Sequence, residues 1–160
     1  MKPGLGDELL LRQMPHSIEA EQSVLGAMLI DPRCIPEVIE ALTADDFYLQ
    51  ANRDIYETMY GMFNFSLTID PVTVLEQMRQ NGVYQEERSR SYILQLMEIT
   101  PTAANVMEYA AIVKDKTLLR RVAETAGELT VLVQEGTDSA QAVLEAAEQK
   151  IYAIRQGRNP

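Results

Sequence analysis

The sequence predicts an all-α fold, in which a compact bundle of short helices is followed by a long helix and an antiparallel helical hairpin. Three observations predict it: apolar residues recur at helical spacing, no segment alternates apolar and polar residues over the length of a strand, and helix-capping residues recur at the turns. The expected parts are a flexible N-terminal tail over 1–14, the bundle over 15–101, the long helix and hairpin over 102–155, and the start of a linker over 156–160.

The composition is typical of a soluble globular protein. The 160 residues are 46% hydrophobic and 24% charged, and a chain of this length buries about two-thirds of its surface on folding. No apolar run approaches the ~18 residues of a membrane span, and the first residues are too weakly apolar for a signal peptide. The single cysteine, Cys34, excludes an internal disulfide and indicates a reducing cytoplasm.

The charge is strongly acidic, with 24 acidic against 14 basic side chains and a net charge of −10. Proteins that bind nucleic acid draw much of their affinity from neutralising phosphates, so this balance argues against direct binding and favours a basic protein partner. One basic cluster lies on the long helix and is interpreted as a solvated helix face rather than a phosphate site: Lys114, Lys116, Arg120 and Arg121.

The clearest helix of the bundle starts at Ser17 and ends before Asp31-Pro32. The Ser17 hydroxyl is a natural N-cap, and Glu19 and Glu21 place negative charge in the first turn, where the helix dipole favours it. Gly26 lies in the middle of this helix, where glycine costs about 1 kcal/mol relative to alanine. We therefore expect a close neighbour at Gly26.

Two further helix entrances carry capping patterns. Thr43 and Asp46 match a capping box that introduces two aromatic anchors, Phe47 and Tyr48. Asp70 precedes a first-turn proline, and Gly82 closes the helix that follows.

The long helix is expected to start with Thr102 as N-cap, after Pro101, and to run to about Gln134. It and the helix after the polar loop QEGTDS each carry an apolar seam with steps of three and four, which predicts a helical hairpin. The seam expected to hold the hairpin together is Leu119, Val122, Ala126, Leu129 and Val133 against Leu144, Ala147 and Ile151.

Four apolar residues of the hairpin lie off this seam or beside it: Val131, Leu132, Val143 and Tyr152. They pack either on the rest of the same chain or on the hairpin of a second chain, and the pattern alone leaves both open.

No catalytic, cofactor-binding or metal-binding motif is found. The eight glycines form neither GxxxxGK[ST] nor GxGxxG, and HExxH, paired cysteines and GxSxG are absent. Neighbouring carboxylates such as Glu86 and Glu87 are explained by solubility and helix capping. We therefore predict an interaction module without catalytic activity of its own.

Four blocks of the sequence resemble the N-terminal domain of bacterial DnaB-type replicative DNA helicases: PHSIEAEQSVLGAMLIDP, ALTADDFY, IDPVTVLEQMRQNG and PTAANVMEYAAIVKDKTLLRR. The resemblance covers roughly 15–154 and assigns structural roles to residues in these blocks. They are Pro15, Ser17, Ile18, Glu19, Glu21, Leu25, Gly26, Asp31, Pro32, Phe47, Tyr48, Asp70, Gly82, Pro101, Thr102 and Asn105. The segment EERSRSY departs from the family, which often has a glycine-containing turn there.

The resemblance implies a collar above the ATPase ring of a replicative helicase. In that family the hairpins of neighbouring subunits pair, giving dimers and a hexamer built as a trimer of dimers, which favours Val131, Leu132, Val143 and Tyr152 as contacts between chains. It further implies docking of the primase C-terminal domain and of a helicase loader, and contact with DNA only through the full-length ring. ATP and Mg²⁺ are expected in a C-terminal RecA-like motor domain that these residues do not include.

The sequence is also compatible with two functions other than a helicase collar. One is a free-standing all-helical adaptor, which a Walker A motif in the reading frame beyond Pro160 would exclude. The other is a small enzyme that uses Glu86 or Glu87, which loss of a hydrolase activity on replacing either residue would support.

Overall fold

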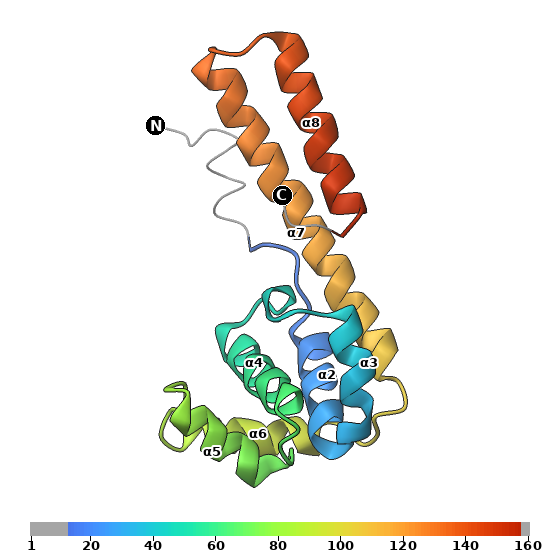
Figure 1. The fold of residues 1–160 in the computed structure, drawn as a ribbon, viewed down its shortest axis with the longest axis vertical. Coiled ribbons are helices and arrows are strands. Elements are labelled where there is room, and N and C mark those ends of the chain that lie inside the picture. Colours follow the sequence, from blue (N-terminus) through green and yellow to red (C-terminus); the bar gives the residue numbers. More distant parts are fainter. Residues whose placement is uncertain (1–12, 158–160) are drawn as a thin grey trace. The chain divides into compact units, whose positions relative to one another are not determined.

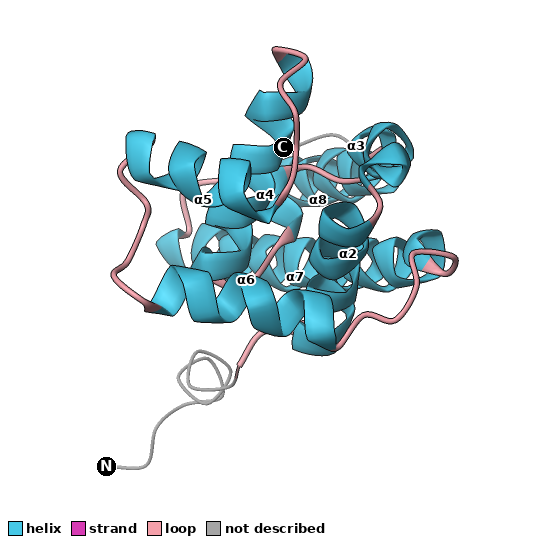
Figure 2. Cartoon of the chain, turned by 90° about the horizontal axis from the view of Figure 1, so that it is seen from below, coloured by secondary structure: helices cyan, strands magenta, loops and turns pink. Residues whose placement is uncertain are grey.

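The computed structural model describes residues 13–157, and these residues form helices, turns and loops with no strand (Figures 1 and 2). The α-helices are α2 (Ile18–Ile30), α3 (Ile35–Ala41), α4 (Gln50–Asn64), α5 (Pro71–Gln80), α6 (Arg88–Glu98), α7 (Val106–Glu135) and α8 (Ala140–Arg155). Two 3-10 turns, η1 (Pro32–Cys34) and η2 (Ala44–Asp46), flank α3. The predicted all-α fold is confirmed.

The chain divides into two compact units, and α7 runs through both. The bundle comprises His16–Asp115, and the hairpin unit comprises, among the described residues, 116–157 together with 13–15. The bundle therefore takes in the first part of α7 and extends beyond residue 101, the end predicted from the sequence. Residues 1–12 of the expected tail and 158–160 of the expected linker lie outside the described residues.

Helix α2 is the central element of the bundle, and α3 and α4 lie on either side of it in Figure 1. It also packs against α6, and its Val24, Leu25 and Met28 are completely buried. A Cβ atom on Gly26 would lie 2.0 Å from Thr100 Oγ1 and 2.5 Å from the Leu96 carbonyl oxygen. The close neighbour expected at Gly26 is therefore the end of α6.

The predicted caps of the bundle form as expected. Ser17 Oγ accepts a hydrogen bond of 3.2 Å from Ala20 N, and α2 ends at Ile30 with Asp31 as C-cap. The remaining caps also match their predicted chemistry: a capping box joins Thr43 and Asp46, another joins Asp70 and Thr73, and Gly82 follows α5 with a φ of +75°. Local capping chemistry thus determines these helix ends.

The predicted start of the long helix is wrong, because α7 begins at Val106 and not after Thr102. Thr102 Oγ1 accepts a hydrogen bond of 3.1 Å from Ala104 N, two residues further on, and Val106 N donates to the Ala103 carbonyl at 3.2 Å. These are the bonds of a separate turn. The Asn105 carbonyl then accepts from Tyr109 N at 3.3 Å, a helical bond at the start of α7.

Cys34 follows Pro32 in the turn between α2 and α3, and its half-buried position raises the pKa of its thiol to about 11. Because the thiolate is the reactive form, we expect Cys34 at about pH 8 to react with iodoacetamide at least ~10-fold more slowly in the folded chain than in the chain unfolded in guanidinium. The alkylation rate measured by mass spectrometry tests this. Equal rates in the two states would show that the folded chain does not protect the thiol.

Candidate functional site

The hairpin consists of the C-terminal part of α7 and α8, which run side by side and antiparallel (Figure 1). The connection turns at Gly136, which has a φ of +67°, and Ser139 Oγ caps α8 by accepting a hydrogen bond of 3.1 Å from Ala142 N. An ion pair of 2.7 Å between Lys150 Nζ and Glu128 Oε2 joins the two helices. The predicted hairpin is therefore present.

The predicted seam does not hold this hairpin together. Leu119, Val122, Val133, Leu144 and Ile151 are between 41% and 64% exposed, and Ala126 is exposed as well. Only Leu129 and Ala147 of the predicted seam are partly buried. The prediction is therefore wrong for six of its eight residues.

The inward face of each hairpin helix lies one residue earlier along the chain, a rotation of about 100°. From Leu118 onward, the buried or partly buried residues on this face of α7 are Leu118, Arg121, Thr125, Leu129 and Leu132, and on α8 they are Val143, Ala146, Ala147, Lys150, Ala153 and Ile154. Several of these residues are polar. The aliphatic stems of arginine and lysine cover apolar surface, Arg121 Nη1 is itself buried, and Lys150 Nζ pairs with Glu128. The hydrophobicity of the residues alone therefore marks the wrong face.

The exposed apolar residues form a regular stripe on each hairpin helix, which we call the outer stripe: Leu119, Val122, Ala126 and Val133 on α7, and Leu144 and Ile151 on α8. Leu119, Ala126 and Val133 are spaced by seven residues, as are Leu144 and Ile151. A seven-residue repeat of apolar residues is the pattern by which helices pack on partner helices.

The four predicted contacts between chains separate into two pairs. Val131 and Tyr152 are 50% and 61% exposed, so both are accessible to a partner. Leu132 and Val143 are partly buried in the single chain, on the inward faces of the two helices. Contact between chains remains a prediction for all four residues. The exposed pair, Val131 and Tyr152, is the more accessible to a second chain.

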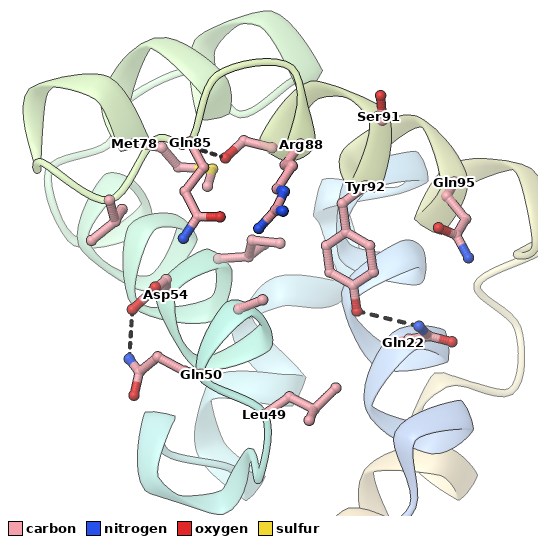
Figure 3. Close-up of a pocket in the computed structure, with 14 residues that line it drawn as sticks. Gln22, Leu49, Gln50, Asp54, Met78, Gln85, Arg88, Ser91, Tyr92 and Gln95 are labelled. Carbon is pink, nitrogen blue, oxygen red and sulfur yellow. Dashed lines mark hydrogen bonds between the residues drawn. The ribbon is translucent and has the colours of Figure 1, made fainter.

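The bundle has a groove with a volume of about 530 Å³, between α2, α4, α5 and α6 (Figure 3). Its apolar lining includes the side chains of Leu49, Ile55, Met78 and Val83. The rest of its lining is mostly polar: Gln22, Gln50, Asp54, Gln85, Arg88, Ser89, Ser91, Tyr92 and Gln95. These side chains suit hydrogen bonding to a polar ligand or to a peptide backbone.

A polar network that includes the groove residues Gln22 and Tyr92 starts at Glu21, which is 1% exposed. Its carboxylate accepts hydrogen bonds from Tyr48 N at 2.9 Å and Leu49 N at 3.4 Å, at the entrance to α4, and from Asn52 Nδ2 at 3.0 Å. Neither the dipole role nor the structural role predicted for Glu21 from the sequence includes this burial or these partners. Its position four residues before Leu25, on the apolar face of α2, is the signal that could have indicated burial.

The network continues from α4 to α6 and back to α2. The Tyr92 hydroxyl donates to Asn52 Oδ1. It accepts a hydrogen bond of 3.3 Å from Gln22 Nε2 (Figure 3). Burial is the main cause that raises the pKa of Tyr92, so the hydroxyl stays protonated and able to donate. The network thus ties three helices together at the wall of the groove.

The basic cluster of α7 is not simply a solvated face. Lys114 Nζ lies 3.2 Å from Asp46 Oδ2, and the Asp46 carboxylate is completely buried. Further along the helix, Arg120 donates a hydrogen bond of 2.7 Å to the Pro15 carbonyl and one of 3.3 Å to Thr117 Oγ1. The predicted solvated face is therefore wrong for Lys114 and Arg120, which stabilise the fold.

The other residues of the predicted family motifs differ in their burial. Phe47 is completely buried and packs against Tyr56, and Tyr48 is partly buried, with its ring stacked on His16 at a centroid distance of 4.2 Å. The two aromatic anchors thus pack as predicted. The remaining motif residues on the surface are Ile18, Glu19, Pro32, Pro101, Thr102 and Asn105, with Pro15 partly buried.

Within residues 13–157, no three histidine, cysteine, aspartate or glutamate side chains are grouped so as to hold a metal ion. None of the helices described is both long and apolar enough to cross a membrane.

Residues 13–115 match the family described as DnaB-like helicase N terminal domain. Among curated proteins, the replicative DNA helicase DnaB of Geobacillus stearothermophilus is 36% identical over 148 residues, and that of Pasteurella multocida is 34% identical over 146 residues. The matches cover 91% and 90% of this chain but only 32% and 31% of those proteins, so the chain spans about a third of their length.

A solved structure supports the same relationship. The crystal structure of the N-terminal domain of DnaB helicase from Mycobacterium tuberculosis matches with a TM-score of 0.80 and 33% identity, covering 88% of this chain and 99% of that one. Sequence and fold thus agree over nearly the whole length, and the chain belongs to the DnaB-like helicase N-terminal domain family.

Proposed function

We propose that this chain is the collar domain of a replicative DNA helicase and that it self-associates through the outer stripe of its hairpin. The observation that carries the proposal is the exposure of Leu119, Val133, Leu144 and Ile151 on helices whose inward faces are already packed. Apolar residues repeated at seven-residue intervals on an exposed helix face are typical of a surface that is covered by a partner helix.

The free energy gained by burying the outer stripe is of the size expected for reversible pairing. Covering the exposed part of one such side chain contributes about 1 kcal/mol, so the five large residues of the outer stripe contribute roughly 10 kcal/mol across a symmetric pair of chains. Association itself costs about 4–15 kcal/mol. Pairing of this isolated chain is thus expected to depend on concentration, and a dimer would be the unit of a hexamer built as a trimer of dimers.

The proposal includes the partners that the resemblance implies. The primase C-terminal domain, and in some bacteria a helicase loader, would dock on the collar, while a C-terminal RecA-like domain would bind ATP and Mg²⁺, contact DNA and unwind it. The groove and the acidic surface support a docking role, since they offer hydrogen-bonding side chains and negative charge to a protein partner.

We expect the native chain to self-associate and a Leu119→Asp, Leu144→Asp variant to be a folded monomer, because a charge on each stripe would be desolvated in the pair. Light scattering across concentration measures the mass, and circular dichroism checks folding. The control is Leu94→Asp, which changes a 48% exposed leucine of the bundle and should leave the mass unchanged. A native chain that stays monomeric at high concentration would contradict pairing through the outer stripe.

A further inference from the structure

A second apolar surface lies on the bundle, where α4 ends and α5 begins. We call it the α4–α5 patch: Tyr60, Phe63, Phe65, Leu67 and Val72, which are 41%, 37%, 80%, 48% and 76% exposed. The same two helices direct Met62, Val74 and Met78 into the core, each at most 3% exposed. The patch is therefore additional to the apolar residues that stabilise the fold, and neither the groove nor the hairpin includes it.

Hydrogen bonds at the end of α4 hold the patch in place. Leu67 N donates to the Met62 carbonyl at 2.9 Å, and Ser66 N donates to the Phe63 carbonyl at 3.0 Å. Ser66 has a φ of 55°, the left-handed conformation that completes a Schellman motif at the end of a helix. The backbone around Phe65 is thus fixed by regular capping, and its exposed ring is held by an ordered turn.

The start of α5 is fixed in a similar way. Asp70 Oδ1 accepts a hydrogen bond of 2.9 Å from Thr73 N, and Thr73 Oγ1 donates to the Thr68 carbonyl at 2.8 Å. Both ends of the connection between α4 and α5 are therefore ordered before any partner binds. A preorganised apolar surface loses little conformational entropy on binding.

Negative charge flanks the patch on both helices. Glu57 lies three residues before Tyr60 on α4, and Glu76 lies four residues after Val72 on α5, so each carboxylate shares a helix face with a patch residue. Both glutamates are exposed. The nearest cation on α5, Arg79, stacks over the Tyr84 ring at 4.4 Å and is only 4.0 Å from Glu76, a weak surface pair.

The net negative charge of the chain is concentrated on the bundle, the unit that carries the α4–α5 patch. The bundle carries 16 acidic and 6 basic side chains, a net charge of −10, whereas the rest of the sequence carries 8 of each. Such a field repels nucleic acid, anionic membranes and the bundle of a second copy. It attracts a cationic partner. A protein segment that has both an apolar face and positive charge therefore fits the patch and its surroundings.

We propose that the α4–α5 patch docks a cationic amphipathic helix of another protein. The apolar face of that helix would cover Phe65, Leu67 and Val72, and its lysine or arginine side chains would lie against Glu57 and Glu76. Helices recognised in this way present apolar anchors at three- and four-residue spacing. This surface goes beyond hairpin pairing and does not depend on it.

The test uses the full 160-residue chain and two synthetic helical peptides of about 18 residues with the same leucine face, one with lysine and one with glutamate on the opposite face. We expect saturable binding of the lysine peptide only, measured by fluorescence anisotropy, weakening as salt is added. Amide chemical-shift changes should centre on residues 60–72.

Phe65→Ser with Val72→Ser should lower the affinity for the lysine peptide about 10-fold or more, and so should Glu57→Lys with Glu76→Lys. The matched control, Leu94→Ser with Ile99→Ser, removes two apolar residues of the same unit that are 48% and 47% exposed and should leave the affinity unchanged. The Leu119→Asp, Leu144→Asp variant should still bind, which separates this proposal from hairpin pairing.

Four results would overturn the proposal. The first two are the absence of saturable binding of the lysine peptide and an equal loss of affinity in the patch and control variants. The other two are a patch variant that changes the solution mass, which would assign the patch to a second copy, and patch-dependent binding of phosphatidylglycerol vesicles, which would assign it to a membrane.

Discussion

Replacing Gly26 by alanine is expected to lower the free energy of unfolding of the bundle by about 3 kcal/mol or more, within the range of overpacked cores. The added Cβ atom would lie 2.0 Å from Thr100 Oγ1 and 2.5 Å from the Leu96 carbonyl oxygen. Thr100 cannot simply rotate away, because its hydroxyl donates a hydrogen bond of 2.8 Å to that same carbonyl. Relief therefore requires α2 and α6 to separate.

The matched control is Gly61→Ala on α4, where a new Cβ atom would have no neighbouring atom within 4 Å. This substitution should stabilise the same unit by about 0.5–1 kcal/mol, because alanine loses less conformational entropy in a helix. Urea unfolding followed by circular dichroism measures both. If Gly26→Ala were as stable as the native chain, the close packing of α2 on α6 would be incorrect.

The sequence predicts the bundle well because its signals are local. Ser17, Asp70 and Gly82 act at helix ends through their own backbone neighbourhood, and the structure shows each where the pattern places it. Thr102 is the exception, since its hydroxyl can cap either a helix or a short turn, and residue type does not distinguish the two. The three-residue error at the start of α7, from residue 103 to Val106, follows from this ambiguity.

The hairpin was harder to predict because an apolar pattern finds the most hydrophobic face and does not name the partner of that face. Within the chain, the inward faces of α7 and α8 combine Leu118, Leu129, Leu132 and Val143 with Thr125, alanines and the side chains of Arg121 and Lys150. The outer stripe, which has the more regular apolar pattern, lies on the exposed face. On both hairpin helices the apolar pattern marks the outer stripe, whereas the chain buries the neighbouring face. This difference indicates that the outer stripe contacts something outside the chain.

The network at Glu21 was missed for a different reason. Charged residues in the first turn of a helix are usually solvated and favoured by the helix dipole, and Glu19 follows this rule because it is exposed. Glu21 differs because its partners, Tyr48, Leu49 and Asn52, lie far along the chain. No local pattern reports such a partner, so burial at this position depends on tertiary structure.

Glu21→Ala is the second change with a large expected effect, a loss of about 3–5 kcal/mol in the free energy of unfolding. The carboxylate accepts from two backbone amides and one side-chain amide, and the substitution leaves these buried donors without a partner. Glu19→Ala, on the exposed side of the same turn, is the control and should change stability by less than about 0.5 kcal/mol.

A structural consequence beyond stability separates this mechanism from simple loss of packing. Asn52 accepts from the Tyr92 hydroxyl, so freeing its amide group from Glu21 lets the side chain turn and disturbs Tyr92 at the wall of the groove. We expect Glu21→Ala to shift the Tyr92 ring resonances and to lower the raised pKa of Tyr92 toward its ordinary value as water enters. Glu21→Gln, which still offers one acceptor oxygen, should fall between the native chain and the alanine variant in both stability and tyrosine titration. If Glu21→Ala left the Tyr92 resonances and titration unchanged, Glu21 would act only at the entrance to α4 and not through the network to α6.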